Sequence, residues 1–280
     1  MKQLFDEVSY KCSKIVTKKY STSFSLATKM LSKNIRDHIY NIYGFVRFAD
    51  EIVDTFHEYD KEGLLDQFER DYYLSLHQGI SLNPILNSFI YTVKTFNITD
   101  DLVQAFLKSM RADLYKSDYT TQEEYEAYIY GSADVVGLMC LKVFVNGDEA
   151  KYNQLKEPAK RLGSAFQKVN FLRDLKADFE DLNRSYFPNI DLQNLDNQSK
   201  QAIIEDIEAD FNFAFNNGIL QLPVEAKFGV YMAYRYYRKL LNKLKNTPST
   251  KIMDSRIRIS NPMKINLLAR SYVKYKLNLI

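Results

Sequence analysis

The sequence predicts an all-α protein, and three features of the chain support this prediction. Nine glycines and six prolines make up only 15 of the 280 residues, well under the usual share of about 12%, so turns should be few and helices long. Apolar residues recur every three or four positions through most of the chain, as on one face of an α-helix. Alternation of apolar and polar residues never lasts more than a few positions, so we expect no β-strands.

The N-terminal segment is expected to form a helix over about residues 4–19, followed by a polar turn. Ser21 and Ser23 lie in this turn, just before Phe24. Their hydroxyl groups and the nearby backbone amides would suit a phosphate, but capping of a helix would use the same groups. Both interpretations stay open from the sequence.

The next helix, over about residues 35–56, carries a polar face beside apolar residues at helical spacing. Steps of three and four place the members of this face on one side of the helix. They are Tyr43, Arg47, Asp50 and Asp54, with Glu51 alongside. Two aspartates four residues apart repel each other unless a cation lies between them. Asp50, Glu51 and Asp54 are therefore candidate ligands of a hard divalent metal, although a solvated helix face can carry the same pattern.

Four further helices are expected in the middle of the chain. They cover residues 61–77, a stretch opened by Asn83-Pro84, a stretch capped by Thr99, and residues 121–146. The last has capping-box spacing from Thr121 to Glu124 and passes through Tyr128. Small residues from Gly131 to Gly137 would let a neighbouring helix or a substrate chain approach its backbone closely.

A second polar stripe lies on a helix over about residues 156–181. Its members, again three or four residues apart, are Gln167, Asn170, Asp174 and Asp178. Two such helices facing each other across a cavity would supply four carboxylates. Mg²⁺ prefers oxygen ligands and usually binds through one or two carboxylates plus substrate phosphates. The pattern therefore indicates metal-assisted departure of a diphosphate, and Arg184, in the irregular segment that follows, would place a guanidinium near it.

The C-terminal third is expected to add three helices. Two cover residues 199–217 and 223–245, a loop covers residues 247–254, and Asn261-Pro262 opens the last helix. Arg256, Arg258 and Lys264 form a local basic group. We find no internal repeat apart from the paired acidic pattern, and we expect residues 1–280 to form one domain.

Composition excludes several classes of function. The net charge of +3 is small and dispersed, which argues against nucleic-acid binding. Cys12 and Cys140 are far apart and the three histidines do not cluster, so we expect no zinc site. We also expect no secretory leader and no membrane-spanning helix, because no run approaches 18 apolar residues. A cytoplasmic location is the resulting expectation.

On these motifs the chain resembles the squalene/phytoene synthase family, over nearly its whole length from Ser21 to Pro262. The first family motif is matched by Asp50-Glu51-Ile-Val-Asp54 with Tyr43 and Arg47 before it, and the second by Gln167, Asn170, Arg173, Asp174 and Asp178. Arg184 to Pro188 matches a third segment. Weaker matches are Ser21, Ser23, Phe24, Tyr128, Gly137, Tyr237 and Arg258. Three positions depart from the pattern: Thr22 stands where some members carry a basic residue, Ala177 where an acid is common, and Asp134 where Gly is common.

The resemblance implies the isoprenoid synthase fold, a single helical bundle around a central substrate cavity. It implies that two identical prenyl diphosphates condense head to head with Mg²⁺, or Mn²⁺ as the alternative ion. The metal ligands would be Asp50, Glu51, Asp54, Asn170, Asp174 and Asp178. Catalytic roles would fall to Asp50, Asp54, Asp174, Asp178, Tyr43 and Arg47. The diphosphate and its chain would contact Ser21, Ser23, Phe24, Arg47, Tyr128, Gln167, Asn170, Arg184, Tyr237 and Arg258.

The length of the substrate has two alternatives. Thr28 lies one helical turn after Phe24 if helix continues there, and so small a residue would leave room for a C20 chain, which gives phytoene. The alternative is a C15 chain, which gives squalene or dehydrosqualene; no G-x-G-x-x-G pattern indicates the nicotinamide that squalene formation needs. A non-catalytic helical scaffold or lipid-binding protein is the alternative from another class. The insoluble product favours peripheral contact with a membrane, although no strongly basic amphipathic helix marks it in the sequence. The oligomeric state is not predicted.

Overall fold

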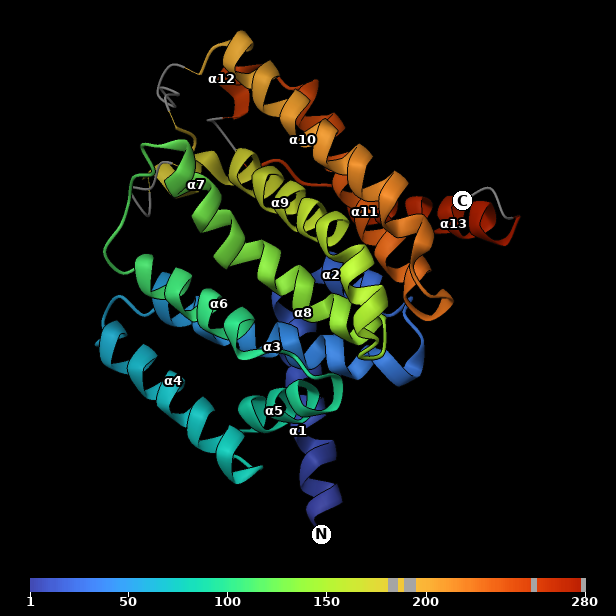
Figure 1. The fold of residues 1–280 in the computed structure, drawn as a ribbon. Helices are drawn as coiled ribbons and strands as arrows, with labels where there is room; N and C mark the ends of the chain where they lie inside the picture. The colour runs from blue at the N-terminus through green and yellow to red at the C-terminus, as the bar shows by residue number, and fades with distance from the viewer. Residues whose placement is uncertain (181–185, 189–194, 253–255, 278–280) are drawn as a thin grey trace.

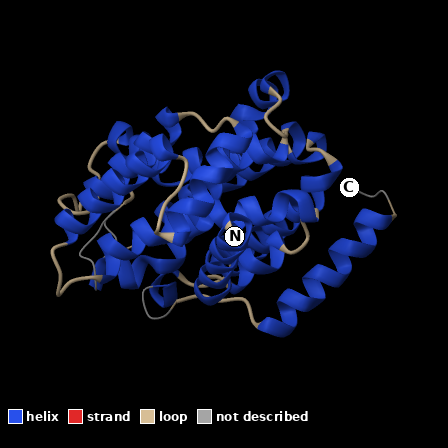
Figure 2. Cartoon of the chain, turned by 90° about the horizontal axis from the view of Figure 1, so that it is seen from below, coloured by secondary structure: helices blue, strands red, loops and turns tan. Residues whose placement is uncertain are grey.

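The computed structural model describes residues 1–180, 186–188, 195–252 and 256–277, with only the backbone of residues 177–180. Within these ranges the chain is built from helices, and Figure 2 shows no strand. Figure 1 shows the helices gathered in one bundle, with the N-terminal helix projecting from one end. The all-α prediction is confirmed for the part of the chain that the structure describes.

The helices of the described residues follow in chain order. Their bounds are α1 Lys2–Tyr20, α2 Thr22–Thr28, α3 Lys33–Thr55, α4 Lys61–Gln78, α5 Pro84–Phe96, α6 Asp100–Ala112, α7 Gln122–Ile129, α8 Val135–Phe144, α9 Glu149–Glu180, α10 Asn197–Asn217, α11 Val224–Lys245, α12 Ser249–Ile252 and α13 Asn261–Lys276. A π-helical turn, Tyr130–Asp134, joins α7 to α8, and a 3₁₀ turn, Ile219–Gln221, precedes α11.

Helix ends occur where local chemistry predicts them. The side chain of Asn83 accepts hydrogen bonds from the amides of Ile85 and Leu86 at the start of α5. Gly79 ends α4 with a φ of +79°, a conformation that costs glycine little.

Two local expectations are wrong. Residues 21–24 do not form a turn between helices, because Ser21 caps α2 and accepts a hydrogen bond from the Phe24 amide at 3.2 Å. The capping interpretation therefore holds for Ser21. Residues 249–252 form the short helix α12 inside the expected loop.

The buried apolar side chains form two clusters. In the first, Phe45 of α3 stacks on Phe89 of α5, with ring centroids 4.0 Å apart. The second lies among α9, α10 and α11 and includes Phe211, which is fully buried. Close packing of α9 on α8 needs small residues: a Cβ added at Gly137 would lie 3.2 Å from the Ala159 carbonyl oxygen. The small residues of this region therefore serve contact between neighbouring helices, and Ser132, Ala133 and Gly137 also line the cavity described below.

The helical stretch Gln122–Phe144, which includes α7 and α8, is long and apolar enough to span a membrane by length and composition. An unbroken run of 18 apolar residues, the criterion applied to the sequence, did not single out this stretch. More than half of its apolar window, 56%, is buried inside the bundle, as in the core helix of a soluble protein. By itself one such helix is weak evidence for a membrane span.

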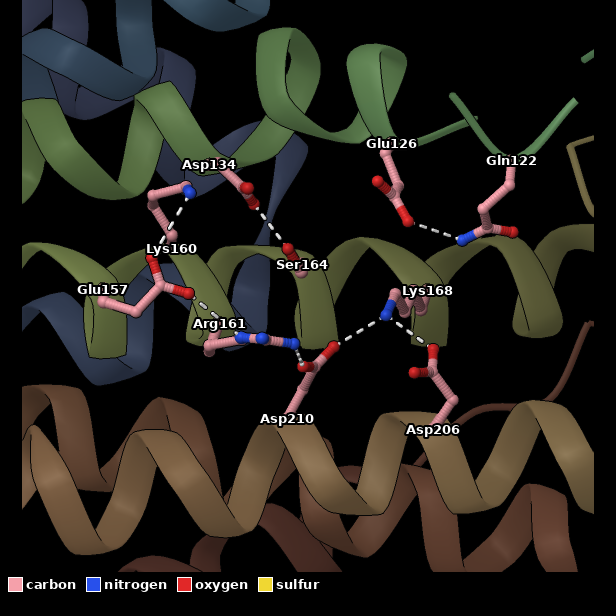
Figure 3. Close-up of polar contacts among 10 residues, drawn as sticks. All are labelled: Gln122, Glu126, Asp134, Glu157, Lys160, Arg161, Ser164, Lys168, Asp206 and Asp210. Carbon is pink, nitrogen blue, oxygen red and sulfur yellow. Dashed lines mark hydrogen bonds and ion pairs between the residues drawn. The ribbon is translucent and has the colours of Figure 1, made fainter. Parts of the chain in front are cut away.

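An ionic network centred on the buried pair Lys168–Asp210 joins α9 to α10 (Figure 3). The Lys168 ammonium lies between the carboxylates of Asp206 and Asp210, 2.7 Å from the latter, and Arg161 pairs with Asp210 at 2.9 Å. Burial alone would lower the pKa of Lys168, but Asp210 and Asp206 outweigh it and the pKa is raised. Two cations of α9 thus pair with two carboxylates of α10, and these pairs favour one register of α9 along α10. This matters because α9 carries the second polar stripe on another face.

Candidate active site

A cavity of about 280 Å³ lies inside the bundle and is lined mainly by apolar side chains. It is bounded by residues of α2, α3, α8, α9, α10 and α11. Phe24, Val46, Phe166 and Ala233 are typical wall residues. Tyr43 and Gln167, the first members of the two polar stripes, line the same cavity from α3 and α9. The structure therefore brings the two stripes to one hollow.

Tyr43 joins the apolar wall to the stripe on α3. Its ring stacks on Phe24, with centroids 4.9 Å apart. Burial raises the pKa of Tyr43 to about 12, while Arg47 and a side-chain hydrogen bond with Ser21 act in the opposite direction. The phenol is therefore neutral at physiological pH and lies between the end of α2 that Ser21 caps and the guanidinium of Arg47.

Arg47 holds the acids of α3. Its guanidinium donates to the carboxylates of Asp50 and Glu51 and lies over the ring of Tyr20, 4.5 Å from the centroid. Burial alone would lower the pKa of Arg47, but the two carboxylates outweigh it and raise the pKa. Asp54, one turn further along, is partly exposed. One arginine on the same helix therefore neutralises part of the negative charge of the first acidic motif.

The stripe on α9 is held from two sides. Gln167 donates to the Ser132 hydroxyl of the π-helical turn at 3.4 Å. The Tyr237 phenol of α11 donates to the amide oxygen of Asn170 at 3.2 Å, and its ring stacks on Phe166 at 4.1 Å. Tyr237 also interacts electrostatically with Tyr43. Tyr237 therefore fixes the stripe on α9 from α11.

Asp174 is paired with two arginines. Its Oδ1 atom lies 2.9 Å from Nε of Arg173 and 2.7 Å from Nε of Arg256. Burial would lower the pKa of Arg173, but the interaction with Asp174 is stronger and raises it. Both acidic motifs are thus occupied by guanidinium groups.

The donor set fits a hard divalent cation. Asp50, Asp54, Asn170 and Asp174 offer carboxylate and amide oxygens, which suit Mg²⁺ and Mn²⁺ and not a soft metal. Within the described side chains, no group of three or more His, Cys, Asp or Glu residues is close enough to hold an ion without rearrangement. In the described structure Arg47 pairs with Asp50, and Arg173 and Arg256 pair with Asp174. The side chains of Asp178 and Arg184 lie outside the described residues.

Other predicted contact residues fall in different places. Ser23 lies in α2 and is partly buried. Tyr128 is absent from the cavity wall as described: its ring stacks on Tyr186, and its hydroxyl donates to Asp113 at 3.0 Å. Its predicted place beside the substrate is therefore not supported by its position. The backbone carbonyl of Arg258 accepts a hydrogen bond from Lys243.

Two functional candidates escaped the sequence analysis of the site. Arg256, and not Arg258, forms the ion pair with Asp174. The Lys264 ammonium of α13 donates to the Thr22 hydroxyl at 2.9 Å, and burial and Arg258 lower the pKa of this lysine. The Lys264 ammonium thus lies beside Thr22, the position at which the sequence analysis noted a basic residue in some members of the family. The basic group at residues 256–264 was the only signal in the sequence, and it did not show which members reach the site.

Comparison with known proteins gives the family of the chain. The model of the squalene/phytoene synthase family matches residues 17–262. The chain belongs to this family. A 15-cis-phytoene synthase from Synechocystis sp. is 27% identical over 297 residues, covering 96% of this chain and 86% of that protein. A 4,4'-diapophytoene synthase from Staphylococcus haemolyticus is 28% identical, covering 73% of this chain and 69% of that protein.

Solved structures show the fold. A dehydrosqualene synthase superposes with a TM-score of 0.83 at 22% identity, covering 97% of this chain and 98% of the other. A squalene synthase from Alicyclobacillus acidocaldarius gives 0.75 at 20% identity, covering 87% and 96%. The expected isoprenoid synthase fold is confirmed, and the chain is a prenyltransferase of the squalene/phytoene synthase type.

Proposed function

We propose that this prenyltransferase condenses two molecules of geranylgeranyl diphosphate head to head, with Mg²⁺, to give phytoene. The reaction would pass through a cyclopropylcarbinyl diphosphate. The observation that supports a C20 substrate is the position of Thr28. This residue is 2% exposed and lines the cavity one turn after Phe24. Its hydroxyl donates to the Phe24 carbonyl at 2.9 Å. The hydroxyl is thus satisfied within α2, and a short side chain leaves this part of the cavity open to a long prenyl chain.

Asp50, Asp54, Asn170 and Asp174 would hold the ions, together with Asp178. The bound ions would neutralise the diphosphate and stabilise it as a leaving group.

The arginines would then change partners. Arg47 would be released from Asp50 and Glu51, and Arg173 and Arg256 from Asp174, if those carboxylates held a cation. Each freed guanidinium offers a planar pair of donors that suits phosphate oxygens. The arginine pairs of the free protein therefore serve as a reserve of positive charge for the diphosphate.

The apolar wall would protect the reactive cation. Phe24, Tyr43 and Phe166 offer aromatic faces, each able to stabilise a cation by about 0.5–2 kcal/mol. Apolar side chains around them exclude water, which would otherwise quench the intermediate.

The direct test supplies two substrates in parallel. Purified protein with Mg²⁺ is given geranylgeranyl diphosphate or farnesyl diphosphate, and diphosphate release and hydrocarbon products are measured. We expect a C40 hydrocarbon from the first, with no change on addition of a nicotinamide. Turnover of farnesyl diphosphate alone would contradict the C20 proposal and support the alternative, dehydrosqualene formation, which the Staphylococcus haemolyticus relative favours.

A further inference from the structure

The C-terminal helix α13 lies at the rim of the bundle (Figures 1 and 2). Of its 16 residues only Ser271 is buried. Its inner side packs on α11, where the ring of Tyr275 lies 4.9 Å from that of Phe228. The rest of its surface faces outward.

That outer surface carries an apolar stripe. Ile265, Ala269, Val273 and Leu277 follow one another at steps of four, so they lie on one side of the helix. Ile265 is 66%, Val273 55% and Leu277 63% exposed, and Tyr272 is exposed beside them. Single exposed apolar side chains are common on protein surfaces, but these form a continuous row. A continuous exposed apolar row marks an interaction surface.

The charges around the stripe have one sign. Arg270, Lys274 and Lys276 are exposed and flank it. From residue 255 to the last residue the sequence contains six basic residues and no acidic one: Arg256, Arg258, Lys264, Arg270, Lys274 and Lys276. An apolar row between basic side chains is the pattern of a helix that lies in the plane of a membrane surface.

We propose that α13 docks on the surface of an anionic lipid bilayer. The apolar stripe enters the headgroup region, and Arg270, Lys274 and Lys276 contact the lipid phosphates. The same charges disfavour a second copy of the chain as the occupant, since two such helices would bring like charges together.

Docking on this face would place the polar end of the cavity near the bilayer. Lys264, in the first turn of α13, bonds to Thr22 of α2, and Arg256, a few residues earlier, pairs with Asp174. The helix is therefore tied to the residues around the acidic motifs. Long prenyl chains and a hydrocarbon product leave water for an apolar phase, so a site beside the bilayer shortens their path through water.

Vesicle co-sedimentation tests the proposal independently of turnover. The full chain is mixed with vesicles of phosphatidylglycerol and phosphatidylcholine, or of phosphatidylcholine alone. We expect binding to the anionic vesicles and its loss at high salt. The combined variant Arg270→Gln, Lys274→Gln, Lys276→Gln should bind about a hundredfold more weakly, at about fivefold for each basic residue.

Matched variants show whether vesicle binding depends on α13 or only on net charge and on exposed apolar residues in general. Lys94→Gln, Lys108→Gln and Lys156→Gln remove the same charge from exposed lysines on α5, α6 and α9 and should leave binding unchanged. Ile265→Ser, Val273→Ser and Leu277→Ser should weaken binding at least tenfold. Leu74→Ser, Leu82→Ser and Val224→Ser, at residues at least 55% exposed elsewhere on the surface, should not.

Equal binding to both vesicle types, or equal losses in both variant sets, would overturn the proposal. So would a concentration-dependent dimer, in size-exclusion chromatography, that the α13 variants abolish.

Discussion

The phenol of Tyr237 on α11 donates a hydrogen bond to the amide oxygen of Asn170 on α9, across 3.2 Å. Burial raises the pKa of Tyr237, so this donor keeps its proton at physiological pH. Asn170 is a candidate metal ligand. The bond from Tyr237 fixes the orientation of its side-chain amide, with the oxygen toward Tyr237. Tyr237 is therefore a positioning residue for the stripe on α9.

The change Tyr237→Phe removes this bond and keeps the stacking on Phe166. We expect kcat/KM to fall about threefold to tenfold, the effect of one lost hydrogen bond, with a higher Mg²⁺ concentration needed for half-maximal rate. Tyr234→Phe is the matched control, because this tyrosine on the same helix stacks on Phe215 away from the stripe. An unchanged Mg²⁺ dependence in the Tyr237 variant would contradict the positioning role of Tyr237.

Arg256 and Arg258 provide a matched pair. Arg256→Gln removes a guanidinium that pairs with Asp174, and we expect KM for the prenyl diphosphate to rise about tenfold or more. Arg258→Gln should have a smaller effect, because only its backbone carbonyl has a described hydrogen bond. Steady-state kinetics of both variants measure KM for the prenyl diphosphate. A larger effect of Arg258→Gln than of Arg256→Gln would assign the diphosphate contact to Arg258.

Thr28→Phe fills part of the cavity from α2. We expect turnover of the C20 substrate to fall at least tenfold relative to the C15 substrate, since overpacking excludes the longer chain. Thr95→Phe is the control: Thr95 on α5 is exposed and also donates its hydroxyl to the carbonyl four residues earlier. Equal losses on both substrates in the Thr28 variant would mean that chain length is set elsewhere.

The ionic network of Figure 3 predicts unequal effects of two similar changes. Asp210 is 2% exposed, and Asp210→Asn leaves Lys168 and Arg161 without its charge. We expect a loss of about 3 kcal/mol or more in the free energy of unfolding, measured with urea. Asp206 is 57% exposed, so Asp206→Asn should cost below about 1 kcal/mol. Similar losses in both variants would mean that the buried pair does not dominate.

Asp134 predicts a dependence of stability on pH. Burial raises its pKa from 3.8 to about 7, against opposing effects of Ser164, Lys160 and Lys168; Asp210 adds to the rise. An acid whose pKa is raised by folding keeps its proton longer in the folded state, so it stabilises the fold at acidic pH, and this contribution is lost as pH rises toward 7. The Asp134→Asn variant should lose less stability between pH 4 and 7 than the parent chain, by urea unfolding at each pH. Identical pH profiles would contradict the raised pKa.

The sequence was informative where the chemistry is local. Asp50 and Asp54 share a face of α3 because helical spacing alone determines it, and the cap at Asn83 depends on residues two and three positions away. Arg256 could not be chosen over Arg258 in this way. The choice depends on how residues 256–260 pass Asp174, which is 82 positions earlier in the chain.

Tyr128 shows the same limit. Its side chain turns to Asp113 and Tyr186, from two other parts of the chain. The exposed row on α13 was also hidden, because helical spacing shows that Ile265 and Val273 share a side but not that α11 leaves this side uncovered.

The central claim is that the stripes of α3 and α9 form one site for metal and diphosphate. Titration calorimetry of inorganic diphosphate with Mg²⁺ tests it most directly, on the parent chain and on Asp50→Asn, Asp174→Asn and the exposed control Asp148→Asn. We predict that each stripe variant alone loses Mg²⁺-dependent binding, while the control keeps it. Parental affinity in either stripe variant would contradict a shared site.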